Sequence, residues 1–198
     1  MRILPLVAIL ISTLKTMGQN VPLDPCADLT RLSVTNARAV LMSNADSGSY
    51  SSKVDCLATA IDRLGEHHDP QDVPLLISYL AFARPSKHQD PYITMHPTPP
   101  EHGYPAIEAL ARQGESARTP LLNYIGVAVD SLKRHNATYA FVSIKALEPA
   151  SSILQLKERR QSGQSDVASR FDDAITFAKT IWPCKKTPTS CEKASSDK

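Results

Sequence analysis

The sequence predicts an all-α protein, a short α-solenoid of about eight helices, and three observations carry this prediction. Apolar residues recur at three- and four-residue steps along most of the chain, which is the spacing of one helical face. Aromatic residues make up only 6% of the chain, and the β-branched alternation that a sheet would need is absent. A helical pair also recurs after 46 residues, and repeats of this kind stack to bury a continuous core.

The N-terminal segment, from Met1 to Gly18, has the pattern of a secretory signal peptide. Arg2 precedes an apolar run from Ile3 to Leu14, and small residues precede a cleavage point after Gly18. The run is shorter than the ~20 residues that a membrane-spanning helix needs. We therefore expect an exported, soluble protein, secreted or periplasmic, with no integral membrane association after cleavage.

The rest of the chain has ordinary globular statistics, since 42% of all residues are hydrophobic and 21% are charged. We expect one repeat domain at residues 19–183 and a flexible tail at residues 184–198. Cleavage after Gly18 would remove Arg2 and Lys15 and leave basic and acidic residues equal in number, so nucleic acid is not an expected partner. Residues 19–115 hold 12 acidic and 7 basic residues, whereas residues 116–198 hold 8 and 13, a difference that solvated helix faces can also produce.

Four cysteines in an exported chain favour disulfides. Of the three possible pairings we favour Cys26 with Cys56, which would join the first helix to the second, and Cys184 with Cys191, which would close a short loop in the tail. Zinc ligation is the alternative. The chain has no CxxC pair and no histidine near the C-terminal cysteines, so we do not expect a metal there.

Three predicted helical segments come first: a capping helix at 26–44 and a helical pair at 51–68 and 69–83. Ser51 or Ser52 is expected to cap the first helix of the pair. Its core face contains Val54, Leu57, Ile61 and Leu64. In the second helix, Asp69 can cap and Pro70 fits the first turn. The core face of this second helix contains Val73, Leu76, Leu80 and Ala83, widened by Leu75, Tyr79 and Phe82.

A shift of 46 residues superposes this pair on a second pair with six identities. The identical residues are Ala60, Ile61, Leu64, Pro74, Leu75 and Leu76, matched by Ala106, Ile107, Leu110, Pro120, Leu121 and Leu122. The segments CLATAIDRLGEHHDPQDVPLLISYL and YPAIEALARQGESARTPLLNYI resemble HEAT-like repeats of the phycobilin-lyase type. Ala111 replaces the glycine equivalent to Gly65, although Gly114 lies nearby. The resemblance implies a right-handed stack of helical hairpins with a concave surface, and it supplies no ligand.

Two further segments complete the predicted stack. YAFVSIKALEPASSILQLKERR, residues 139–160, is a weaker third copy in which Ala146 and Leu147 match Ala109 and Leu110. A last helix at 165–182 is expected to cap the stack. Its apolar stripe contains Val167, Phe171, Ala174, Ile175, Ala178 and Trp182.

The segment RPSKHQDPYITMHPTPPEHGYP, residues 84–105, lies between the two clear copies. A hairpin of this kind needs about 28 residues, so the 46-residue spacing makes residues 84–103 an insertion that leaves both hairpins intact. Loops beyond ~12 to 15 residues in a compact domain are usually functional or disordered. The predicted binding residues are His88, Tyr92, His96, His102 and Tyr104. The same histidines, His88, His96 and His102, are weaker candidates for a zinc or copper site.

Other polar groups favour structural interpretations. His67, His68 and Asp69 form an HHD turn that could hold a metal, but neighbouring histidines diverge and Asp69 is better explained as a helix cap. Asn136 begins an Asn-Ala-Thr glycosylation acceptor, and we interpret it instead as a cap of the next helix. The Asp172–Asp173 pair is expected on a solvated face, without the burial that would shift a pKa into the working range of an acid–base catalyst.

The sequence contains no catalytic signature: GxSxG, HExxH and glycine-rich phosphate loops are absent. We therefore expect a binding or assembly module without catalysis and without a cofactor, whose partner is another exported protein. The alternative is a periplasmic protein that binds a metal or small ligand with the loop at 84–105.

Overall fold

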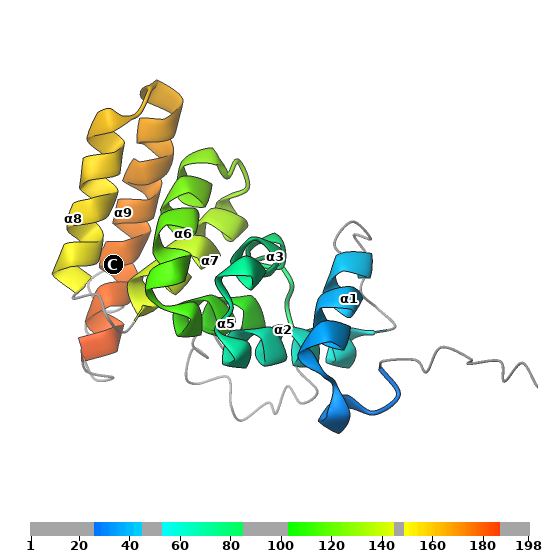
Figure 1. Cartoon of the computed structure of the whole chain (residues 1–198). Helices are drawn as coiled ribbons and strands as arrows, with labels where there is room; N and C mark the ends of the chain where they lie inside the picture. The colour runs from blue at the N-terminus through cyan, green and yellow to red at the C-terminus, as the bar shows by residue number, and fades with distance from the viewer. Residues whose placement is uncertain (1–25, 45–52, 85–102, 145–148, 187–198) are drawn as a thin grey trace, which may run out of the picture.

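The structure, a computed structural model, describes residues 26–44, 53–84, 103–144 and 149–186, and within these ranges every regular element is helical (Figure 1). The α-helices are α1 (Val34–Asn44), α2 (Val54–His67), α3 (Val73–Ser78), α5 (Pro105–Gln113), α6 (Glu115–Val127), α7 (Ser131–Ser143), α8 (Pro149–Ser162) and α9 (Ser165–Lys186). Two 3₁₀ turns, η1 (Leu29–Arg31) and η2 (Pro70–Asp72), precede α1 and α3. The prediction of an all-α protein is confirmed for these residues.

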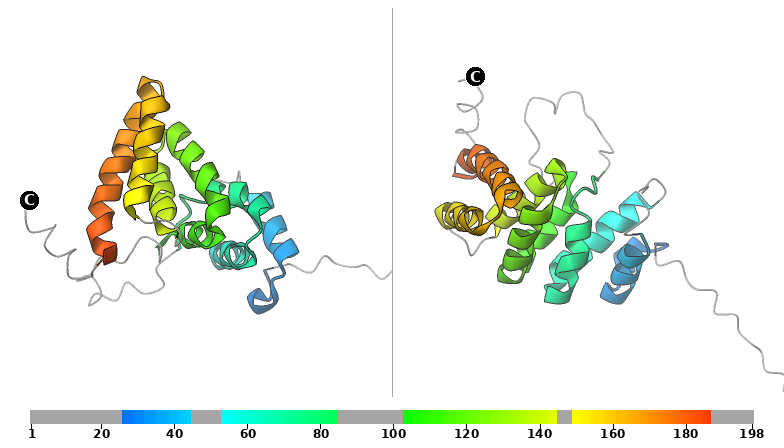
Figure 2. Two further views of the ribbon diagram at one scale, coloured as in Figure 1. Left: turned by 60° about the vertical axis from the view of Figure 1, so that its left-hand side comes forward. Right: turned by 90° about the horizontal axis from the view of Figure 1, so that it is seen from above.

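The helices cross the molecule in chain order, from α1 at one end to α8 and α9 at the other (Figures 1 and 2). α1 packs on α2, α2 packs on α5, and α3 packs on α5 and α6. α7 packs on α5 and α6, while α9 packs on α6, α7 and α8. The predicted third pair differs from the first two in one respect. Its second helix, α8, makes few contacts with α6, whereas α3 packs on α6.

The first pair begins at Val54 and turns at His68. Lys53 occupies the N-cap position of α2 and makes no side-chain cap hydrogen bond, so the predicted Ser51 or Ser52 cap is wrong. At the other end, His68 adopts a left-handed conformation with φ of 55°. The Asp69 side chain then accepts a hydrogen bond from the backbone N–H of Gln71, as predicted for a cap.

The second helix of the first pair is shorter than its apolar pattern predicts. The helix predicted at 69–83 is η2 followed by α3, which ends at Ser78. Asn136 Nδ2 donates to the Leu80 carbonyl oxygen at 2.6 Å, which gives that buried group a partner outside the helix. The chain can therefore leave the helix early without an unsatisfied carbonyl at Leu80.

Two glycines shape the first two pairs, one at the contact between them and one in the turn of the second. A Cβ atom at Gly65 would lie 2.7 Å from the Cα of Ala109, so α2 and α5 approach more closely there than a side chain permits. Gly114 separates α5 from α6 with φ of 63°, a conformation that strains other residues. Gly114 therefore makes the turn of the second pair. The position equivalent to Gly65 in this pair is Ala111, three residues before the turn.

α7 corrects the interpretation of Asn136. Asp130 is the N-cap of this helix, and its side chain accepts from the backbone N–H of Lys133. Asn136 lies in the middle of α7 and is 4% exposed. A buried asparagine is a poor glycosylation acceptor in the folded chain, so neither use considered for Asn136 fits the structure.

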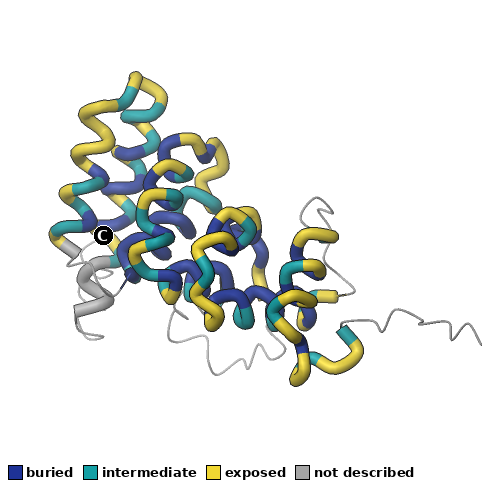
Figure 3. Tube along the Cα trace, in the orientation of Figure 1, coloured by how far each residue is buried: buried dark blue, intermediate teal, exposed yellow. Residues whose placement is uncertain are grey.

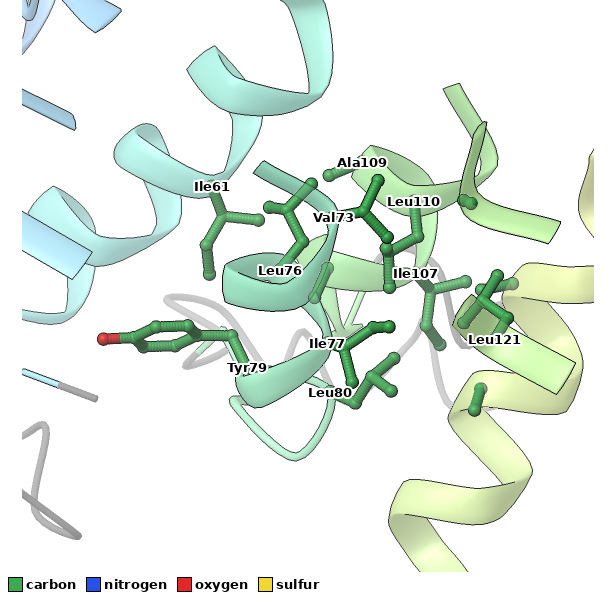
Figure 4. Close-up of a cluster of buried hydrophobic side chains, with 14 of the residues drawn as sticks. Ile61, Val73, Leu76, Ile77, Tyr79, Leu80, Ile107, Ala109, Leu110 and Leu121 are labelled. Carbon is green, nitrogen blue, oxygen red and sulfur yellow. The ribbon is translucent and has the colours of Figure 1, made fainter. Parts of the chain in front are cut away.

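The apolar core runs between the helices, and polar residues cover the outside (Figure 3). Leucine and isoleucine side chains from α2, α3, α5 and α6 meet at the centre of the two hairpins (Figure 4). The fully buried members include Ile61, Leu64, Leu76, Leu80, Ile107, Leu110 and Leu121. Spacing along the chain predicted Ile61, Leu64, Leu76 and Leu80, and the repeat matched Ile107, Leu110 and Leu121 to residues of the first pair. The structure buries all seven.

A disulfide joins Cys26 to Cys56, the pairing that we favoured, and its Cα atoms are 5.5 Å apart. This bond ties the segment before η1 to the first turn of α2. The predicted Cys184–Cys191 bond, the signal peptide and the side chain of Trp182 lie outside the described residues. No helix in the described part of the chain is long and apolar enough to span a membrane.

Candidate functional site

The base of the predicted loop is described, although most of the loop is not. His88, Tyr92, His96 and His102 lie outside the described residues, so their arrangement stays a prediction. The backbone N–H of Arg84 donates to the Gly103 carbonyl oxygen at 2.7 Å. The segment 85–102, which connects these two positions, therefore begins and ends at the same point of the molecule.

Side chains reinforce this base. Arg84 Nη2 lies 2.6 Å from the Asp62 carboxylate on α2. Burial raises the pKa of the Asp62 carboxyl, and the Arg84 guanidinium partly offsets that effect. Tyr104, the remaining predicted binding residue, is the N-cap residue of α5 and packs against the core, partly buried. Tyr104 is thus placed as a support of the loop base, with only part of its ring accessible.

The HHD turn forms an ion-pair cluster with α1. Arg38 Nε donates to the Asp72 carboxylate at 2.6 Å, and Arg38 Nη2 contacts the Asp69 carboxylate at 2.5 Å. Asp72 is 2% exposed, and His67 Nδ1 lies 3.8 Å from its Oδ2. The Gln71 backbone N–H and the Arg38 guanidinium hold the pKa of Asp69 below its ordinary value.

Among the described residues, His67, Asp69 and Asp72 are the only group with three possible ligand atoms close enough for one metal ion. Both carboxylates already accept hydrogen bonds from Arg38, which supplies the positive charge that a metal would supply. His68 turns away, and its Nδ1 lies 2.7 Å from the Glu66 carbonyl oxygen. The turn is therefore best explained as the contact that holds α1 on the first hairpin. The sequence alone did not show that Arg38 pairs with its carboxylates.

The corner between α6 and α7 exposes apolar side chains. Val127 is 64% exposed, Val129 is 81% exposed and Leu132 is 43% exposed. They are three of the five large hydrophobic residues that are exposed in the described part of the chain, so exposure is concentrated here. Contiguous exposed apolar surface is typical of sites that bind other proteins. We call Val127, Val129 and Leu132 the apolar corner.

Arginine side chains hold the backbone of the apolar corner. Arg134 Nη1 donates to the Ala128 carbonyl oxygen at 2.8 Å and to that of Val129 at 3.2 Å. Arg170 Nη1 donates to the Gly126 carbonyl oxygen at 2.9 Å. The carbonyl groups on both sides of Val127 are thereby fixed, so the apolar side chains are presented on an ordered backbone.

The hold on the corner extends to α9. Arg134 Nε donates to the Asp173 carboxylate at 2.6 Å, and His135 Nε2 lies 3.1 Å from the same oxygen. The His135 ring stacks on Phe177 with a centroid distance of 4.3 Å. Burial raises the pKa of Asp173, but the hydrogen bonds from Arg134 and His135 outweigh it and hold that pKa below its ordinary value. Asp173 is therefore partly exposed and ion-paired, and its pKa is shifted away from the working range of an acid–base catalyst.

A groove of about 500 Å³ lies between α6 and α8. Glu115, Arg118, Thr119 and Leu122 line it from α6, and Gln155, Glu158, Arg159 and Ser162 line it from α8. No sequence motif marks this groove, because the whole of α7 separates its two walls along the chain. Comparison with models of known protein families, with characterised proteins and with solved structures finds no match for this chain.

Proposed function

We propose that this chain is an exported, HEAT-like helical scaffold that binds another exported protein and performs no catalysis of its own. The repeat interpretation is supported by the packing of equivalent helices, because α2 packs on α5 and α3 packs on α6. The close contact of Gly65 with Ala109 joins the first helices of both copies. Stacked hairpins of this kind offer extended surfaces for binding.

The observation that carries the proposal is the apolar corner. The corner gathers three of the five large hydrophobic residues that are exposed in the described part of the chain, and arginine side chains fix the backbone that presents them. A preformed surface loses little conformational entropy on binding. We therefore assign the corner as the main contact for the partner protein.

The test begins with photo-crosslinking on the intact exported protein. A photoreactive residue at position 129 is expected to capture one defined partner, whereas the same residue at position 42 is not. Met42 is 70% exposed on α1, so it is a matched control for exposure. Capture at both positions, or at neither, contradicts the assignment.

The purified partner then provides the quantitative test. The double substitution Val129→Ser and Leu132→Ser is expected to weaken binding by about tenfold or more, which corresponds to ~1.4 kcal/mol. Met42→Ser is expected to leave the affinity unchanged. Equal affinities for the wild type and the double variant would show that the corner is not the contact.

A second candidate function is binding of a metal ion or small ligand by the inserted loop. The observation that favours it is the closure of the loop base by Arg84 and Gly103, since the hairpins need no such insertion to be joined. Calorimetric titration with zinc or copper is then expected to reveal a saturable site. The site should disappear when His88, His96 and His102 are all replaced by alanine, and a flat titration of the wild type rejects this candidate.

A further inference from the structure

The groove between α6 and α8 is the hollow surface that the proposed function leaves unused. α6 and α8 both lie alongside α9, and the left view of Figure 2 shows them next to each other on the same side of the molecule. A volume of about 500 Å³ is within the range of sites that bind small ligands or short peptide segments. Leu122, which is 6% exposed, is its apolar lining residue.

Arg118 is held in a fixed orientation in this groove. Its Nε donates to Gln155 Oε1 at 2.7 Å, and its Nη1 donates to Glu115 Oε1 at 2.7 Å. Neither bond uses Nη2, which has no acceptor among the described residues. A guanidinium that is oriented by two neighbours and still has free N–H groups is preorganised to bind a carboxylate.

The other lining residues narrow the chemistry of the ligand. Arg159 adds a second cation, and within the described residues neither Arg159 nor Glu158 forms an ion pair. Glu115 is paired with Arg118, and Glu158 is a second carboxylate in the lining. The attraction for an acidic ligand is therefore local to Arg118 Nη2 and Arg159 and is not a property of the whole groove. The surrounding half of the chain, residues 116–198, has 13 basic and 8 acidic residues, which favours approach of an acidic segment.

Hydroxyl and amide groups complete the lining. Thr119, Gln155 and Ser162 offer both hydrogen-bond donors and acceptors, which suits the N–H and C=O groups of an extended peptide backbone. We propose that this groove binds an extended segment of the partner protein in which an acidic residue lies two positions after an apolar one, because residues two apart in an extended chain face the same side. The carboxylate binds between Arg118 and Arg159, and the apolar side chain packs on Leu122.

This inference rests on the proposed function, since a peptide ligand presupposes a protein partner. Its test uses a peptide and not the partner, so the two proposals can fail separately. The probe is N-acetyl-Leu-Ala-Glu-Ala-amide, titrated into the isotopically labelled protein and followed by NMR amide shifts. The matched probe N-acetyl-Leu-Ala-Gln-Ala-amide has the same size and lacks the charge.

We expect saturable shifts at α6 and α8, with about tenfold weaker binding of the Gln peptide, because a charge-assisted hydrogen bond to arginine is lost. Arg118→Gln should remove the preference for the Glu peptide. Arg112→Gln is the control, since Arg112 forms a comparable ion pair with Glu108 on α5 outside the groove. Arg159→Gln provides a second test if Arg118→Gln perturbs the fold.

Three results would overturn the inference: no saturable shift with the Glu peptide, equal binding of the two peptides, or an unchanged preference in both groove variants. If the peptide binds but position 129 captures no partner, the proposed contact at the apolar corner is rejected and the proposal for the groove is retained. Retained partner binding with no peptide response would reject the groove alone.

Discussion

Three buried side chains connect helices by donating hydrogen bonds to main-chain carbonyl groups of earlier elements. Tyr79 donates to Leu41 in α1, and Gln113 donates to Leu64 in α2. Asn136 donates to Leu80, just beyond α3. Leu41 and Leu64 lie in the last turn of their helices, where carbonyl groups lack an intrahelical partner. These contacts join successive layers of the molecule through polar groups inside an apolar core.

Tyr79→Phe tests the value of one such contact. The ring stays buried, but the Leu41 carbonyl loses its donor, so the free energy of unfolding is expected to fall by about 1–2 kcal/mol. Urea unfolding at neutral pH measures the change. Tyr124→Phe is the control, since Tyr124 is only partly buried and its hydroxyl has no hydrogen-bond partner among the described residues. Equal effects of the two substitutions would assign no specific role to the Tyr79 hydroxyl.

Asp173 provides a prediction of pH dependence. Its pKa is lowered in the folded protein, so its contribution to stability is present above the ordinary carboxyl pKa and is lost as pH falls through the lower folded pKa. Asp173→Asn is therefore expected to destabilise the protein at pH 7 and progressively less below about pH 4. Thermal unfolding of both proteins from pH 3 to 7 measures this difference. A gap between the two melting temperatures that stays constant over this range contradicts the prediction.

At the scale of elements, the crossing of α2 and α5 depends on one missing side chain. Gly65 lets α2 approach the backbone of Ala109, and Gln113 then reaches the end of α2 from the same face of α5. The sequence repeat predicts that these helices are equivalent. The repeat does not predict the close contact of Gly65 with Ala109, because the position that matches Gly65 in the second copy is an alanine, Ala111.

Gly65→Ala is expected to destabilise the protein by about 1–3 kcal/mol, even though alanine favours helix formation, because the new Cβ atom would overlap Ala109. Gly103→Ala is the matched control, since a Cβ atom there meets nothing within 4 Å. The comparison uses chemical denaturation of the two variants and the wild type. Destabilisation of the Gly103 variant alone, or of neither variant, would show that the crossing tolerates a side chain.

At the scale of the whole molecule, successive helices pack on their neighbours and no single central layer collects them (Figure 2). α9 closes one end, where it contacts α6, α7 and α8. The Cys26–Cys56 disulfide strengthens the opposite end, where α1 has one neighbouring hairpin. The two ends of the molecule are thus stabilised by different means.

Excision of the inserted loop tests whether the hairpins are independent of it. Replacement of residues 85–102 by Ser-Gly-Ser should leave a folded protein whose melting temperature changes by only a few degrees, because Arg84 and Gly103 are already in hydrogen-bond contact. Circular dichroism and calorimetry check this result. A same-length Gly/Ser replacement separates the effect of composition from that of length, and unfolding of the short variant would contradict the inference that the loop is an insertion.

The sequence by itself determined the helical class and the core stripe of α2, and it predicts the repeat and the place of the insertion. These features depend on periodicity, because the spacing of apolar residues shows which face of a helix is buried. Helix caps were harder to predict from the sequence. Asp69 was predicted correctly as a cap, while Ser51, Ser52 and Asn136 were not. Local pattern does not reveal whether a polar side chain has a better partner elsewhere in the chain.

Only the tertiary structure decided which distant polar groups meet. Arg38 reaches Asp72 across 34 residues, and Arg134 reaches Asp173 across 39. The apolar corner and the groove between α6 and α8 also arise from packing, because they depend on which faces α9 leaves uncovered. Spacing along the chain predicts which faces are apolar, but the geometry of packing decides which neighbours cover them, and that geometry leaves the corner and the groove at the surface.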